Sequence, residues 1–257
     1  MAKSFKTKII ILFSLILITG GIGYFANGVY FHSEETITVS SAESTSQPVL
    51  ASIESAVEAK SVCLVPGHGG DDPGAERGTL EEKEINLTVA LQVRTLLEQK
   101  GYIVYMSRET NDITMFKQAR IDFCNNTGAS IMVAIHHNTY SDRSVDYGTA
   151  LYYKKSDQAL ADSILKATSA QLGIKNAGIS KFEDRELYDV SMPAVVTEAF
   201  FMTNTSEYNQ IIKTNSTRLA DEARAISDGI ISYFLNPSPE APILSSEPLV
   251  IDRLDLE

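Results

Sequence analysis

The chain has 257 residues, of which 44% are hydrophobic, and a formal net charge of −11. This length allows one sizeable domain with appended segments, and a core large enough to fold alone. The negative charge argues against polyanionic partners such as nucleic acid, and more weakly against anionic membrane surfaces. We therefore expect no nucleic acid among the partners.

The amino terminus predicts a membrane segment. Lys3, Lys6 and Lys8 precede an apolar stretch from Ile9 to Ala26. About 18 such residues can span a bilayer, and the preceding basic residues place the amino end in the cytoplasm. We expect residues 1–31 to anchor the protein in the cell membrane as a single pass, with the remainder extracytoplasmic. The alternative is a cleaved signal segment and a secreted protein, which the length of the apolar stretch makes less favoured.

Two flanking segments differ from the rest in composition. Residues 32–59 are rich in Ser, Thr, Glu and Ala without a regular period, which predicts an extended stalk. Residues 236–257 contain four prolines and predict a disordered acidic tail. Residues 60–235 remain as the folded domain.

Within this domain, short apolar runs alternate with segments of helical period. The expected strands end near Pro66, Met106, His136, Tyr153 and Glu198. The expected helices carry apolar residues at helical spacing, namely Ile85, Val89, Val93 and Leu96; Phe116, Ala119 and Phe123; Leu160, Ile164 and Ala167; and Leu219, Ala223, Ile226 and Ile230. This alternation predicts an α/β fold of three layers, with a mostly parallel sheet and helices on both faces.

The only cysteines are Cys63, in an expected strand, and Cys124, in an expected helix. We expect two small buried apolar side chains, although a disulfide could persist in an exported protein. No Cys-x-x-Cys spacing exists, so a thiolate metal site is excluded.

Three expected strands end on residues that can hold a metal or move a proton: His68, His136 and Glu198. In open α/β sheets, ligands bind beyond the carboxyl ends of the strands. These three side chains therefore predict a single site. Two histidines and one carboxylate, with an open fourth position, are the ligand set of a catalytic zinc ion, and a further carboxylate would serve as general base and acid.

The residues themselves leave several assignments open. His68 could be incidental to a tight glycine turn, and either His136 or His137 could face the site, because adjacent strand side chains point to opposite faces. Glu81, Glu82 and Glu84 could all simply favour a helix start. Glu198 is costly to bury without a role, but it could instead pair with Arg108 or Arg120. A nucleophilic triad lacks support, because no Gly-x-Ser-x-Gly turn is present.

Five motifs follow one another along the chain: Pro66–Gly70, Glu82–Leu87, Ser107–Arg108 with Asp112, Ile135–Asn138 and Met192–Glu198. As an ordered set, they resemble the motifs of zinc-dependent N-acetylmuramoyl-L-alanine amidases of the amidase-3 family. The resemblance covers roughly residues 60 to 235 and implies a phosphorylase/hydrolase-like fold. It also implies that His68, Glu82 and His136 bind Zn2+ and that Glu198 is the catalytic carboxylate. The implied reaction is hydrolysis of the amide between N-acetylmuramic acid and L-alanine in bacterial peptidoglycan.

The chain departs from the family pattern at Val65, at Phe200 and Phe201, and at Ala177. Val65 replaces an Asp that could orient a metal ligand, Phe200 adds bulk after the catalytic Glu, and Ala177 replaces an Arg. These departures leave two alternatives: a wall-binding or regulatory module whose catalysis has lapsed, or a zinc peptidase or deacetylase on a related wall substrate. The short loops at the catalytic edge further predict an enzyme that needs no activator, unless residues 175–192 fold over the site.

Overall fold

The structure is a computed structural model that describes residues 60–236. The expected anchor and stalk, and all but the first residue of the expected tail, lie outside these residues. Within residues 60–236, none of the helices combines the length and apolarity needed to cross a bilayer.

The described residues form alternating strands and helices, as expected. The strands are β1 (Ser61–Pro66), β2 (Glu76–Arg77), β3 (Leu80–Glu81), β4 (Ile103–Met106), β5 (Ile131–Asn138), β6 (Gly148–Tyr152), β7 (Asn176–Lys181) and β8 (Ala194–Phe201). The helices are α1 (Glu82–Glu98), α2 (Lys117–Thr127), α3 (Gln158–Leu172), α4 (Arg185–Tyr188), α5 (Thr205–Ile211) and α6 (Arg218–Leu235), with a short 3-10 turn at Lys155–Asp157. The sequence did not predict β7, α4, α5 or the small β2–β3 hairpin.

The main sheet has six strands in the order β4-β1-β5-β8-β6-β7. The first four strands of this order run parallel, whereas β6 is antiparallel to β8 and parallel to β7. The carboxyl ends of β1, β5 and β8 therefore meet at one edge, as the prediction of a mostly parallel sheet required.

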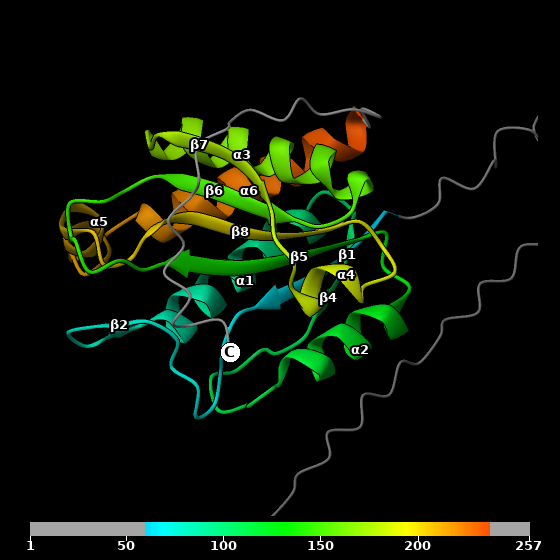
Figure 1. Ribbon diagram of the computed structural model, residues 1–257, viewed down its shortest axis with the longest axis horizontal. Helices are drawn as coiled ribbons and strands as arrows, with labels where there is room; N and C mark the ends of the chain where they lie inside the picture. Colours follow the sequence, from blue (N-terminus) through cyan, green and yellow to red (C-terminus); the bar gives the residue numbers. More distant parts are fainter. Residues whose placement is uncertain (1–59, 237–257) are drawn as a thin grey trace, which may run out of the picture. The chain divides into compact units, whose positions relative to one another are not determined.

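Helices cover both faces of this sheet, giving three layers (Figure 1). One face packs on α1, α3 and α6 through a large aliphatic core that includes Val133, Ile164 and Ile226. The other face packs on α2 and α4 through a second core that includes Met132, Ile121 and Leu187. The predicted inward residues of the first, third and last helices are largely confirmed, because Ile85, Val89, Val93, Leu160, Ile164, Ala223, Ile226 and Ile230 are all buried.

The second helix forms where the sequence predicts it, but only Phe123 of its three predicted inward residues packs against the core. Phe116 precedes α2 and is 78% exposed, and the buried residues of the helix are Arg120, Ile121 and Cys124. The inward face of α2 therefore includes Cys124, which is covalently bonded to Cys63 of β1.

The prediction of two unlinked cysteines was also wrong. Cys63 and Cys124 form a disulfide across 61 positions of sequence, with their Cα atoms 5.7 Å apart. Both are fully buried in the core between the sheet and α2. The sequence could not reveal the bond, because it depends on how α2 packs against β1.

Candidate metal centre and active site

His68 follows β1 in a turn that only small neighbours allow. Its φ is 58°, in the left-handed region. A Cβ on Gly67 would lie 2.2 Å from the His136 ring, and one on Gly74 would lie 2.6 Å from the His68 ring. Both glycines therefore permit the backbone to approach the histidines closely.

Glu82, the first residue of α1, lies between the two histidines. Its Oε2 is 3.1 Å from His68 Nε2, and its Oε1 is 3.2 Å from His136 Nδ1. The backbone N–H of Ala75 donates to Oε2 at 3.0 Å. Burial raises the pKa of Glu82, but hydrogen bonds with His136 and His68 lower it by more, so the pKa lies well below the usual value. The carboxylate is therefore ionised and suited to bind a cation.

The donor set fits a zinc ion. One ligand atom each from His68, Glu82 and His136 lies within 4.8 Å of the others, and all three residues are buried. His136 Nε2 is buried without a hydrogen-bond partner among the described residues. Buried polar atoms are normally paired, so this orphaned nitrogen agrees with a role as a metal ligand.

Asp72, which the sequence did not single out, holds the His68 ring. Its Oδ2 lies 2.8 Å from His68 Nδ1. A carboxylate on the second ring nitrogen orients a metal-binding histidine and raises its basicity. Burial lowers the pKa of His68, but the Glu82 and Asp72 carboxylates raise it by more, and the pKa lies above the usual value.

Arg108 ties the histidine loop to the start of α1. Its guanidinium donates to the carbonyl oxygens of Pro66 at 3.1 Å, Gly67 at 2.7 Å and Lys83 at 2.9 Å. These carbonyls flank His68 and Glu82 in sequence. Arg108 is thus a structural clamp and does not pair with Glu198.

His137 points to the opposite face of β5 from His136, as strand alternation predicts. Its Nδ1 lies 2.7 Å from Asn86 Oδ1, and its Nε2 lies 2.9 Å from Glu222 Oε2 on α6. Asn86 donates in turn to Glu82 Oε1 at 3.1 Å, and the backbone N–H of His137 donates to the same oxygen at 3.1 Å. His137 therefore supports Glu82 from behind. Asn86 could have been found from its i,i+4 spacing to Glu82, whereas Glu222 lies too far along the chain to predict.

Glu198 lies opposite His136 in the β5–β8 register, on the same face of the sheet. It is buried, and its Oε2 has no partner among the described residues. Burial raises its pKa well above the usual value, and the Glu82 and Glu222 carboxylates raise it further. Neither Arg108 nor Arg120 pairs with it, so the structural alternative for Glu198 does not hold in this structure.

The departures from the family pattern do not obstruct this site. Val65 is a core residue, and Asp72 supplies the carboxylate on His68. The register shifts between His136 and Asn138, and Phe200 packs against the His137 ring with centroids 4.5 Å apart. The Phe200 side chain therefore packs in the core, whereas the sequence predicted that it would add bulk beside the catalytic Glu. Ala177 lies in β7, the edge strand separated from β5 by β8 and β6.

The described chain matches the N-acetylmuramoyl-L-alanine amidase family model over residues 62–232. The chain belongs to this amidase-3 family. It is 31% identical over 194 residues to "N-acetylmuramoyl-L-alanine amidase LytC" of Bacillus subtilis (strain 168), covering 74% of this chain and 38% of LytC. It is 25% identical to "Probable cell wall amidase LytH" of Staphylococcus saprophyticus over 68% of this chain and 58% of LytH. The chain thus spans less than two thirds of the length of either relative.

A solved amidase domain has the same fold. The amidase AmiC2 of Nostoc punctiforme superposes with a TM-score of 0.64 at 29% identity, covering 69% of this chain and 98% of that one. The amidase-3 membership and the α/β fold implied by the motifs are thus confirmed.

Proposed function

We propose that this amidase-3 protein is a zinc-dependent hydrolase that cleaves the amide between N-acetylmuramic acid and L-alanine in peptidoglycan. The proposal rests mainly on the buried His68–Glu82–His136 cluster and on Glu198 in β8, the strand beside β5, whose Oε2 has no hydrogen-bond partner among the described residues. Family membership supplies the substrate class.

His68, Glu82 and His136 would hold the metal. When bound in such a site, zinc polarises a carbonyl and lowers the pKa of a coordinated water to about 7. Asp72 fixes the His68 ring, while Asn86 and His137 fix the Glu82 carboxylate. The ligand atoms are therefore held in place before substrate arrives, as efficient catalysis requires.

Glu198 would move the proton. As a carboxylate it accepts the proton of the attacking water, and as a carboxylic acid it donates that proton to the departing nitrogen of L-alanine. The buried surroundings raise the pKa of Glu198 and so favour the protonated form that donates to the nitrogen. Near the amino terminus, three lysines precede the apolar stretch from Ile9 to Ala26. This pattern supports a further proposal, that the catalytic domain works outside the cell membrane and is tethered to it.

The test is digestion of purified muropeptides by the zinc-loaded full chain, with mass spectrometry of the products. We expect an intact stem peptide with a free L-alanine amino group, and no product in the presence of a chelator. A shortened stem would show a peptidase, and loss of an acetyl group would show a deacetylase. Folded, zinc-loaded protein that cleaves no wall preparation would show a module whose catalysis has lapsed.

A further inference from the structure

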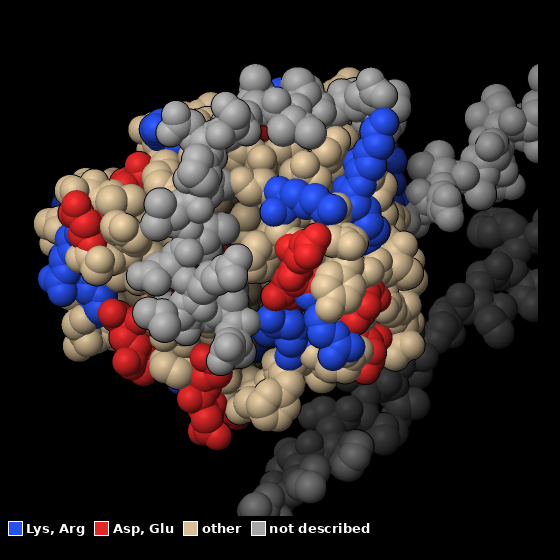
Figure 2. All heavy atoms as spheres, in the orientation of Figure 1, with Lys and Arg blue, Asp and Glu red and all other residues tan. Residues whose placement is uncertain are grey.

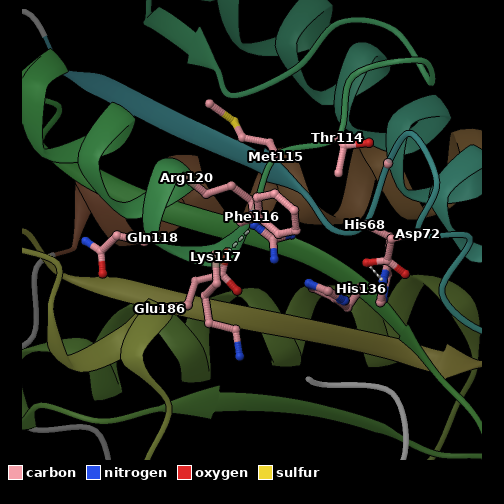
Figure 3. A pocket seen from close by; sticks show the side chains of 11 residues that line it. His68, Asp72, Thr114, Met115, Phe116, Lys117, Gln118, Arg120, His136 and Glu186 are labelled. Atoms are coloured by element: carbon pink, nitrogen blue, oxygen red, sulfur yellow. Dashed lines mark hydrogen bonds and ion pairs between the residues drawn. The ribbon is translucent and has the colours of Figure 1, made fainter.

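A pocket of about 370 Å³ adjoins the two candidate ligand histidines. His68, Asp72 and His136 lie at one end, Arg120 and Glu186 lie toward the other, and Phe116 lies between the two groups (Figure 3). On the proposed function, the stem peptide must occupy space directly beside the metal centre. This pocket offers that space.

Arg120 of α2 and Glu186 of α4 form a buried ion pair within the pocket wall. Their exposed fractions are only 8% and 4%. Arg120 Nε and Glu186 Oε1 are 3.3 Å apart, but neither atom has a hydrogen bond to any residue of the described chain, and Arg120 Nη1 also has none. These three atoms are shielded from solvent, so a ligand in the pocket meets only the remaining exposed edges of the two side chains, both of which line the pocket.

The two elements that carry this pair are fastened together. Lys117 Nζ lies 2.8 Å from Asp184 Oδ2, and Arg185 Nη2 donates to Gln118 Oε1 at 2.6 Å. Acidic and basic side chains are accordingly interspersed over this part of the surface (Figure 2). The pair is therefore held in position without a ligand, which lowers the entropic cost of binding one.

The charges of the pair select the ligand. A carboxylate would accept from Arg120 but would place a second negative charge beside Glu186, and an ammonium group would be repelled by Arg120. A primary carboxamide is neutral and carries both an acceptor oxygen and N–H donors. We propose that this pocket binds the stem peptide and that Arg120 and Glu186 recognise a carboxamide in it, so that stems with an amidated carboxyl group are preferred. This rests on the proposed function, because it assigns a preference to the same reaction.

The test uses two muropeptides that differ only in whether one stem carboxyl group near L-alanine is free or amidated. For the zinc-loaded full chain we expect kcat/KM to be at least about tenfold higher for the amidated substrate, mainly through KM. Glu186→Gln removes the repulsion and should abolish or reverse the preference. Because the ratio compares two substrates on one preparation, partial unfolding of a variant does not change it.

Glu183→Gln is the matched control, because Glu183 is exposed and precedes the same short helix. This variant should keep the wild-type ratio. Equal kcat/KM values for the two substrates, a preference for the free carboxylate, or an unchanged ratio in Glu186→Gln would each overturn the proposal. If neither substrate is cleaved, the proposed function has failed, and calorimetry with the two free stem peptides then tests the pocket by itself. In that case, tighter binding of the amidated peptide supports the pocket assignment, and equal or weaker binding refutes it.

Discussion

Glu82 has the most contacts of the three candidate metal ligands. It touches both histidines and accepts hydrogen bonds from Ala75, Asn86 and the backbone of His137. A buried carboxylate with this many partners stays in a single orientation. Removing it would leave two buried imidazoles without their shared partner.

His68→Ala, Glu82→Ala and His136→Ala should therefore each abolish tight zinc binding, as measured by metal content and calorimetry. Glu84→Ala is the control, since Glu84 is exposed on the same helix turn. His137→Ala should largely retain zinc binding, because the backbone N–H that donates to Glu82 remains and the side chain acts on Glu82 only through Asn86. If His137→Ala loses zinc while His136→Ala keeps it, the assignment of the two faces of β5 is inverted.

Glu198→Gln should keep both the fold and the zinc but lower kcat by about 10²–10⁴-fold. Glutamine has the same shape but cannot shuttle the proton. The measurement is turnover of a muropeptide at matched zinc occupancy. Turnover within a few-fold of wild type would mean that another group moves the proton.

The same substitution should change the pH dependence of stability in the metal-free protein. Because the folded-state pKa of Glu198 is raised, the wild type binds this proton more tightly when folded and loses stability as the pH rises above the unfolded value of about 4.3. Glutamine cannot ionise, so Glu198→Gln should melt at a higher temperature than wild type at neutral pH. The difference should shrink toward pH 4. Parallel melting curves in chelator across the pH range would contradict the raised pKa.

Helix α2 is held by a covalent contact that is distant in sequence. The Cys63–Cys124 bond joins it to β1, and the same helix carries Arg120 into the pocket. The Cys63→Ala, Cys124→Ala double variant should lower the free energy of unfolding by about 2–5 kcal/mol, as judged by denaturant unfolding. Reductant should destabilise the wild type and leave the double variant unchanged. An equal response of both proteins would show that the bond is not what stabilises α2.

The elements also show what the sequence could and could not predict. Helices α1 and α6 carry long apolar stripes, so their buried faces followed from period alone. Helix α2 buries Arg120 and Cys124 on its inner face, and neither its charge nor its bond can be inferred from apolar spacing. Strand β7 has a mixed burial pattern with polar and glycine residues, which gives little strand signal.

In the candidate site, too, the residues marked by a local sequence pattern could be predicted and the others could not. His68, His136 and Glu198 were predictable because each comes at the end of an apolar run in the sequence, but choosing Glu82 among its neighbours depended on the family motifs. Asp72 lies only four residues after His68 in the same loop, so its contact with His68 is local. Glu186 and Glu222 reach the site only through tertiary packing, and no local pattern marks them.

For the whole molecule, the expectation of an enzyme without an activator remains to be tested. The segment from residue 175 to 192, the candidate lid, forms β7 and α4, and α4 is fastened to α2 at the pocket wall. The full chain and residues 60–236 alone should therefore cleave the same soluble wall fragments at rates within a few-fold of each other. A large rise on trimming would reveal a built-in inhibitor in the removed segments.

The hydrogen bond between Glu222 and His137 links the candidate metal site to the carboxyl-terminal end of the folded domain. Glu222 lies on α6, the last helix of the described chain, yet it supports the carboxylate of a ligand on the first helix. Synthesis begins at the amino end, so His68, Glu82 and His136 are made long before Glu222. Until α6 has been made, the Glu82 carboxylate lacks the chain of contacts from Glu222 through His137 and Asn86 that supports it. The candidate metal site therefore reaches its final order only when nearly all of residues 60–236 have been made, and a chain that stops before α6 lacks that order.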